Sequence, residues 1–529
     1  MPGSTVDMKE QIGQVLMAGF RGTTPSPEIL DLIQNYHIGG VILFSRNVQD
    51  ARQVGQLTSD LQMAAKAAGH RHPLLIAIDQ ENGMVQRLGQ SVTNFPGNMA
   101  QGAIGSEQIT HAIALATGQE LRASGINMNL APVVDVNNNP ANPVIGVRSF
   151  GEDPRLVARL GAAAVKGYRE AGVASCLKHF PGHGDTDVDS HLSLPTIPYT
   201  MDRLETIELV PFRSGITAGA DSVMIAHVAF PSLTHNAPAT LSPAIVRGLL
   251  REQLGFDGVI ISDCLEMNAI SETVGVSRGT VLAVQAGNDL VLISHQYARQ
   301  RAGIEAIQSA VQAGELPAEV VAQAAERVMA LKERFLSWDD LPPATTVIGS
   351  EAHQSLRDTA YELSTTVVKN AEGLLPLHLA PTERLLVLIP RRTALTNVED
   401  GHYPHEFFVE HIQHTNTTAI FIAPQPTRAE FVEIDRAVKE SNVVIMVTVN
   451  AYQDRQQGEL MQRLLQSDRP IIGLAVYSPY DLLAFPELRT YMVTYEYTKY
   501  ALVSALSVLF GETQPRGRLP ISLPILPSE

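Results

Sequence analysis

The chain has 529 residues, of which 45% are hydrophobic and 18% are charged, and its formal net charge is -16. This length allows two or three domains that each bury a core, and this composition excludes a disordered chain. Negative charge spread along the chain disfavours nucleic acid and anionic membranes, so we expect neither as a partner.

The N-terminal residues lead directly into an amphipathic helical pattern, and no stretch is apolar for long enough to cross a bilayer. We therefore expect a soluble, cytoplasmic protein, unless a leader has been removed from the chain. Cys176 and Cys264 both stand in apolar runs, so two buried thiols are favoured over one disulfide.

Short apolar runs that read as buried strands recur through the first two-thirds of the chain, with helical patterns between them. They cover residues 15–20, 40–44, 73–79, 127–136, 174–179, 222–228, 258–263 and 289–294. The segment 154–171 is typical of the helices, since Asp153 can cap its start and Gly172 follows its end. Such alternation predicts a parallel sheet covered on both faces, and about eight units in roughly 330 residues predict a TIM-type (β/α)₈ barrel.

A second alternating region follows the predicted barrel. The paired prolines after Asp339 indicate a linker, so we expect a barrel domain over residues 1–336, a linker over 337–350 and a second domain over 351–529. Its predicted strands cover residues 385–389, 419–423, 443–449, 471–477 and 491–495. These strands and the helices between them predict an αβα sandwich.

Polar residues stand at the C-terminal ends of the barrel strands, which meet on one face where barrel enzymes carry their active sites. They are Asp79, Asp135, Lys178 with His179, His227, Asp263 and Ser294. The apolar strand 258–262 delivers Asp263 to this rim, and a carboxylate held there suits a covalent nucleophile, although it could instead cap the next helix.

The loop after the strand 174–179 predicts a general acid/base. Asp189 and His191 stand two residues apart, so the carboxylate can orient the imidazole while the other ring nitrogen faces the substrate. A zinc site built from His179, His183 and His191 is the alternative, but the spacing matches no helix-borne pair and cysteine ligands are absent. A solvated polar loop is the third interpretation. We expect no metal and no other cofactor.

Further residues of the rim suit sugar hydroxyls. Asp79 and Arg87 can form bidentate hydrogen bonds to vicinal hydroxyls, or alternatively a structural ion pair. Arg148 and the pair Lys178-His179 add further donors. His227 either lines the site or is a core histidine with satisfied hydrogen bonds.

Together these motifs resemble glycoside hydrolase family 3, in its bacterial β-N-acetylglucosaminidase branch. The resemblance spans the whole chain and rests on residues 79–81, 178–184, 189–191, 262–263, 364–377 and 511–520. It implies retaining hydrolysis through a glycosyl ester on Asp263, with His191, oriented by Asp189, as acid/base. It also implies that the sugar hydroxyls are bound by Asp79, Arg87, Arg148, Lys178 and His179.

The expected substrate is a short glycan that loses terminal N-acetylglucosamine, because related β-glucosidases lack the Asp-Ser-His element at 189–191. The only tryptophan, Trp338, lies in the linker, and this scarcity of stacking platforms favours exo action on muropeptides or chitooligosaccharides. The second domain is expected to be structural. The chain departs from the family at Asn82-Gly83, where a glycine pair is usual, but asparagine tolerates left-handed backbone.

Several alternatives remain open at this stage. A β-glucosidase or β-xylosidase is the main rival among enzymes of this family. A phosphorylase is another, because a histidine acid/base would not repel phosphate as a carboxylate would. A sugar-binding protein without catalysis and a metal-dependent hydrolase are the rivals from other classes.

Overall fold

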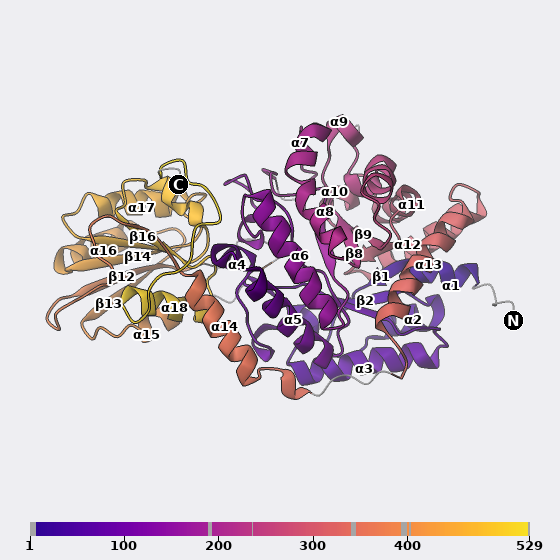
Figure 1. The fold of residues 1–529 in the computed structure, drawn as a ribbon, viewed down its shortest axis with the longest axis horizontal. Helices are drawn as coiled ribbons and strands as arrows, with labels where there is room; N and C mark the ends of the chain where they lie inside the picture. The colour runs from indigo at the N-terminus through magenta and orange to yellow at the C-terminus, as the bar shows by residue number, and fades with distance from the viewer. Residues whose placement is uncertain are drawn as a thin grey trace.

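The computed structural model describes residues 7–188, 193–234, 236–339, 345–392, 399–400 and 404–526. Within them the chain forms an eight-stranded barrel and a smaller α/β domain beside it (Figure 1). The expected two-domain α/β architecture is therefore confirmed.

The barrel sheet is parallel, with the strand order β6-β3-β2-β1-β10-β9-β8-β7. Its strands are β1 (Leu16–Ala18), β2 (Gly40–Leu43), β3 (Leu75–Ile78), β6 (Met128–Asn129), β7 (Cys176–Phe180), β8 (Ser222–Ile225), β9 (Val259–Cys264) and β10 (Leu290–Ile293). Bridges from Met128 to Ala174 and from Val133 to Lys178 join the two end strands, so the barrel is nearly closed. Each of the eight strands coincides with a predicted run, and β7 and β9 extend one residue beyond the predicted ends.

Helices cover the outside of the barrel. They are α1 (Met8–Gln14), α2 (Pro27–Tyr36), α3 (Ala51–Ala67), α4 (Asn98–Ile104), α5 (Glu107–Ala123), α6 (Pro154–Glu170), α7 (Met201–Thr206), α8 (Leu209–Thr217), α9 (Pro231–Thr234), a further helix over Ala244–Gln253, α10 (Asn268–Ser271), α11 (Val276–Ala286), α12 (Tyr297–Gln312) and α13 (Ala318–Phe335). The predicted cap of α6 is confirmed, because the Asp153 side chain accepts from the Arg155 backbone N–H at 2.9 Å.

The second domain contains a six-stranded sheet with the order β11-β16-β15-β14-β12-β13. Its strands are β11 (Thr366–Asn370), β12 (Leu385–Pro390), β13 (Thr417–Ile422), β14 (Val443–Thr448), β15 (Ile471–Ala475) and β16 (Thr490–Val493). Its helices are α14 (Glu351–Ser364), which leads in from the barrel, and α15 (His405–Glu410), α16 (Arg428–Glu440), α17 (Arg455–Leu465) and α18 (Lys499–Leu509). Five of the strands match the predicted runs.

The sixth strand, β11, was not predicted. It lies at the edge of the sheet and runs antiparallel to β16, whereas the other pairs of this sheet are parallel. Only Thr366 of its five residues is buried, so the segment lacks the continuous apolar run by which the other strands were recognised.

The two domains share an apolar interface. Met99 and Ala103 of α4 belong to the same buried cluster as the strands of the second sheet. Backbone hydrogen bonds cross the boundary, from Arg518 to the Ala103 carbonyl at 3.0 Å and from Glu152 to the Pro520 carbonyl at 3.1 Å. The C-terminal segment of the second domain thus returns to α4 and packs against the barrel.

The predicted domain limits, at residues 336 and 351, remain predictions, and part of the predicted linker lies outside the described residues. In the part of the chain that the structure describes, none of the helices combines the length and the apolar character needed to span a bilayer.

Candidate active site

A cavity of about 550 Å³ lies at the C-terminal ends of the barrel strands. Six of the eight predicted site residues line it: Asp79, Arg87, Arg148, Lys178, His179 and Asp263. The other two, Asp189 and His191, lie outside the described residues. The cavity therefore brings together the predicted nucleophile and the predicted sugar-binding residues.

The predicted nucleophile stands at the end of a rigid strand. Residues Val259 to Ser262 of β9 are buried, whereas Asp263 is partly exposed to the cavity. Its carboxylate accepts from the Cys264 backbone N–H at 2.7 Å. The next helix, α10, has Met267 at its N-cap, so the alternative of a helix-capping aspartate is wrong.

A network of buried charges forms the floor of the cavity. The Lys178 Nζ lies 2.7 Å from both the Asp79 and the Glu81 carboxylates. The Arg148 guanidinium donates to both oxygens of Glu81, at 2.8 and 2.9 Å. Of these four groups, Glu81 alone does not line the cavity, so it lies behind the two cations that face the substrate space.

This network fixes the charge state of its members. Burial raises the pKa of Glu81, but the charges of Arg148 and Lys178 outweigh burial and hold that pKa far below its usual range. Burial lowers the pKa of Lys178, yet Asp79 and Glu81 raise it above its ordinary value. Lys178 and Arg148 therefore stay charged and oriented toward the cavity at neutral pH.

A second buried carboxylate orients His179. Asp135 is 1% exposed, and its Oδ2 lies 2.8 Å from the His179 Nδ1. Asp135 also accepts from the backbone N–H groups of His179 and His183. The carboxylate thus selects the tautomer of His179 and leaves the other ring nitrogen for the cavity. The sequence placed Asp135 at a strand end without assigning this role.

The loop after β7 is held close to the barrel by its glycines. Gly182 has a φ of 135°, as expected for a position that needs left-handed backbone. Gly184 is required for another reason, because a Cβ there would lie 1.9 Å from the Val136 carbonyl oxygen. The Asn142 side chain donates to the His183 carbonyl at 2.9 Å, so this part of the loop is also tied to the loop after β6.

The hairpin β4 (Gln80–Asn82) and β5 (Val85–Gln86) follows Asp79. Its turn residues Asn82 and Gly83 have φ values of 68° and 61°, so the departure from a glycine pair leaves the turn intact, as expected.

The second domain contributes two carboxylates to the wall of the cavity, Glu399 and Asp400. The Arg87 Nη1 donates to Asp400 at 2.9 Å, and the Gln86 backbone N–H donates to the same carboxylate at 2.7 Å. Arg87 therefore forms its ion pair across the domain boundary, while Asp79 pairs with Lys178. The expectation of a purely structural second domain has to be corrected, because this domain forms part of the cavity.

His227 does not line the cavity. Its Nδ1 lies 2.7 Å from the Thr240 hydroxyl and its Nε2 lies 3.0 Å from the Cys264 carbonyl, and the side chain is fully buried. The interpretation as a core histidine with satisfied hydrogen bonds is confirmed.

The alternative zinc site of His179, His183 and His191 is not tested as a whole, because His191 lies outside the described residues. His179 contacts Asp135, and the His183 Nδ1 lies 2.8 Å from the Thr186 hydroxyl. Among the described residues one group, Cys264 with Glu266 and His295, brings three ligand atoms within 4.8 Å of one another. Burial raises the pKa of the Cys264 thiol to about 11. Cys176 and Cys264 are both free thiols.

Residues 7–331 match the family model described as the glycosyl hydrolase family 3 N terminal domain. A "Beta-hexosaminidase A" of Pseudoalteromonas piscicida is 39% identical over 408 residues, which cover 70% of this chain and 68% of that protein. A "Beta-hexosaminidase" of Stenotrophomonas maltophilia is 40% identical over 287 residues, or 53% of this chain and 83% of the relative.

Solved structures extend the similarity to the second domain. A family 3 β-N-acetylglucosaminidase from Paenibacillus sp. is 40% identical with a TM-score of 0.91, and the match covers 99% of this chain and all of that one. A fungal multi-domain family 3 β-N-acetylglucosaminidase is 44% identical with a TM-score of 0.94 over 99% of this chain, which spans 61% of the fungal one.

The barrel, with carboxylates and cations gathered at the C-terminal ends of its strands and a second domain closing one wall, places the protein among two-domain α/β-barrel enzymes. Within that class, the chain belongs to glycoside hydrolase family 3.

Proposed function

We propose that this protein removes single β-linked N-acetylglucosamine units from the non-reducing ends of short glycans, with retention of configuration. The observation that carries the proposal is the meeting of Asp263 with Asp79, Lys178, Arg148 and His179 in one cavity. The names of the similar proteins, β-hexosaminidases and β-N-acetylglucosaminidases, support the choice of sugar.

In the proposed first step, the Asp263 carboxylate attacks C1 of the terminal sugar while the glycosidic C1–O bond breaks. His191, oriented by Asp189, gives its proton to the departing oxygen, so the aglycone leaves as an alcohol. In the second step His191 takes a proton from water, and the resulting hydroxide displaces Asp263 from C1. Two inversions at C1 give net retention.

The charged floor supports this chemistry through hydrogen bonds to the sugar. The Lys178 ammonium, the Arg148 guanidinium and the His179 imidazole are donors, and the Asp79 carboxylate is an acceptor. Because these groups are already held by Glu81 and Asp135, they need little reorganisation when the ring flattens in the transition state.

The direct test is turnover of p-nitrophenyl N-acetyl-β-glucosaminide by the wild type, Asp263→Ala and His191→Ala. We expect the wild type to cleave it and Asp263→Ala to lose at least about 10³-fold in kcat/KM. His191→Ala should form the glycosyl ester from this activated leaving group and hydrolyse it slowly, so a burst should precede slow turnover. Unchanged rates in both variants would show that the site is wrong.

Two further measurements test the substrate and the acceptor. Cleavage of the p-nitrophenyl glucoside or xyloside in preference to the N-acetylglucosaminide would favour another activity of this family. Products formed in phosphate buffer decide between hydrolysis and phosphorolysis, because a histidine acid/base does not repel phosphate. Free N-acetylglucosamine as the sole sugar product at high phosphate would exclude the phosphorylase.

A further inference from the structure

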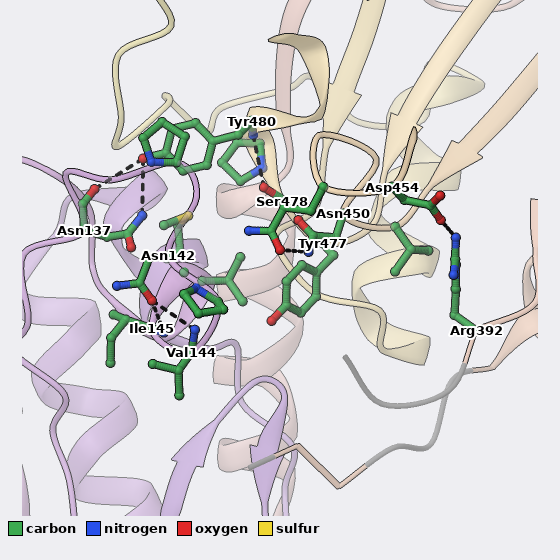
Figure 2. A pocket seen from close by; sticks show the side chains of 18 of the residues that line it. Asn137, Asn142, Val144, Ile145, Arg392, Asn450, Asp454, Tyr477, Ser478 and Tyr480 are labelled. Carbon is green, nitrogen blue, oxygen red and sulfur yellow. Dashed lines mark hydrogen bonds and ion pairs between the residues drawn. The ribbon is translucent and has the colours of Figure 1, made fainter. Parts of the chain in front are cut away.

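A second cavity, of about 490 Å³, lies between the two domains and is almost as large as the active-site cavity. One side is the loop after β6, from Asn137 to Val147, and the other is formed by the ends of β14 and β15 in the second domain. Figure 2 shows Asn137 and Asn142 facing Tyr480, Ser478 and Asn450 across this space.

The floor of this interdomain cavity is buried and held by hydrogen bonds across the boundary. The Asn137 side chain and the Tyr480 hydroxyl are 3.3 Å apart, and that hydroxyl also donates to the Asn137 carbonyl at 3.2 Å (Figure 2). The rim is open by contrast, since Gln425 and Gln453 of the second domain are exposed. The space is thus a pocket with a fixed floor and an accessible mouth.

The interdomain cavity shares a wall with the active site. Val144 and Ile145 line both cavities, and the Asn142 Oδ1 fixes them by accepting from their backbone N–H groups at 3.0 and 2.7 Å. A second link runs through the Tyr477 hydroxyl, which donates at 2.6 Å to Glu399 of the active-site wall. A ligand in the interdomain cavity would therefore lie directly beside the active site.

The lining combines polar and apolar side chains. It contains amide side chains, which donate and accept hydrogen bonds, and the two tyrosines. Its charged groups are Arg392 and Asp454, which form an ion pair (Figure 2), and the exposed Arg455, which pairs with Glu459 outside the lining. Flat apolar contacts come from Pro140, Pro143, Pro424 and Pro479. Paired donors and acceptors beside flat apolar surface suit sugar hydroxyls and ring faces.

We propose that the interdomain cavity is a second saccharide-binding site, which takes a sugar beyond the unit that is cleaved. This inference rests on the proposed glycosidase activity and deepens it, because it predicts a preference for N-acetylchitooligosaccharides, whose further sugar units can occupy this cavity. The sugar belongs either to the leaving part of the substrate or to a separate oligosaccharide.

The test blocks the mouth of the cavity with Gln453→Trp. Gln462→Trp is the matched control, because Gln462 is also exposed and lies on α17, outside the cavity lining. The first readout is the ratio of kcat/KM for N,N′,N″-triacetylchitotriose to that for p-nitrophenyl N-acetyl-β-glucosaminide. We expect Gln453→Trp to lower this ratio about tenfold and the control to leave it unchanged.

Calorimetry of triacetylchitotriose binding to the Asp263→Asn enzyme shows whether the sugar in the interdomain cavity belongs to the leaving part of the substrate or to a separate oligosaccharide. One ligand per chain, bound about tenfold more weakly after Gln453→Trp, indicates the leaving part of the substrate, whereas a second ligand lost in that variant indicates a separate oligosaccharide. Identical binding with and without Gln453→Trp overturns the second site. If the wild type instead cleaves no N-acetylglucosaminide and Asp263→Asn binds no chitotriose, the proposed function has failed.

Discussion

In the barrel, the carboxylate beneath the active site lies against cations, whereas in the second domain two equally buried carboxylates lie against neutral donors. Glu81 contacts Arg148 and Lys178, which hold its pKa far below the usual range against the effect of burial. Asp481 is fully buried and accepts from the Tyr452 backbone N–H, and burial raises its pKa to about 6. Burial likewise raises the pKa of Glu496 to about 7.

The difference shows what each region is built to do. A carboxylate paired with cations keeps its charge over the whole physiological pH range, so the floor of the active site presents a constant field to the substrate. A carboxylate among neutral donors gains a proton near neutral pH, so we expect the stability of the second domain to depend on pH. The costs also differ, because removing one member of an ion network leaves a buried charge without its partner.

The largest expected effect comes from Lys178→Met, which removes the cation shared by Asp79 and Glu81. Truncating one partner of a buried charge pair costs about 2 to 5 kcal/mol. We therefore expect kcat/KM for p-nitrophenyl N-acetyl-β-glucosaminide to fall by about 10³-fold.

Lys166→Met is the matched control, because Lys166 is an exposed lysine on α6. It should keep the wild-type rate, and circular dichroism should show that Lys178→Met still folds. A folded Lys178→Met enzyme with nearly full activity would mean that the buried network does not act on the substrate.

A smaller effect is expected from Asp400→Asn, which weakens the ion pair that the second domain makes with Arg87. Arg87 and Asp400 both line the cavity, so the loss of this contact should loosen the binding of the sugar more than it slows the chemistry. We expect KM to rise about tenfold with kcat within about threefold, since a charge-assisted hydrogen bond contributes about 1.5 kcal/mol.

The same substitution elsewhere in the second domain provides the comparison. Asp435→Asn removes the carboxylate of Asp435 on α16, which pairs with Arg463 on α17 at the surface. This substitution should change neither KM nor kcat. If Asp400→Asn lowers kcat and leaves KM alone, Asp400 does not position Arg87 for binding. If neither Asp400→Asn nor Asp435→Asn changes KM or kcat, the second domain lies beside the site without contributing to it.

Much of the fold could be predicted because the barrel strands are continuous apolar runs. All eight, such as β9 with its buried Val259 to Ser262, follow from that pattern, and the polar residues at the ends of six runs mark the catalytic face. The edge strand β11 was not predicted, because a half-exposed strand has no continuous apolar run. Its position depends on pairing with β16, which is distant in sequence.

A site residue was predicted only where its role follows from residues that are its neighbours in the sequence. Asp263 and Lys178 follow from their strands, but the partners Asp135 and Glu81 acquire their roles through contacts that only the folded barrel creates. Asp400 was not predicted, because it reaches the cavity from the second domain. It follows β12 in the chain, but polar residues after strands were interpreted as site residues in the barrel alone.

The last expected effect is on stability and not on activity, and it concerns Glu496, which joins the domains by accepting from the Gly97 backbone N–H at 2.9 Å. Its pKa is about 7 in the folded chain and is expected near 4.5 in the unfolded chain. Between pH 4.5 and pH 7 the folded state holds a proton that the unfolded state has lost, so the free energy of unfolding decreases as pH rises. The decrease is about 3 kcal/mol in total, and the free energy of unfolding no longer changes with this group above its pKa in the folded chain.

Glu496→Gln resembles the protonated side chain and should lack this decrease. Urea unfolding at pH 5 and pH 8 should therefore show that the variant gains stability relative to the wild type at pH 8, by about 2.5 kcal/mol more than at pH 5. Glu487→Gln, at an exposed position of the same domain, should follow the wild type at both values. Parallel curves for the wild type and Glu496→Gln would show that Glu496 is charged in the folded protein and that the contrast between the two domains does not hold.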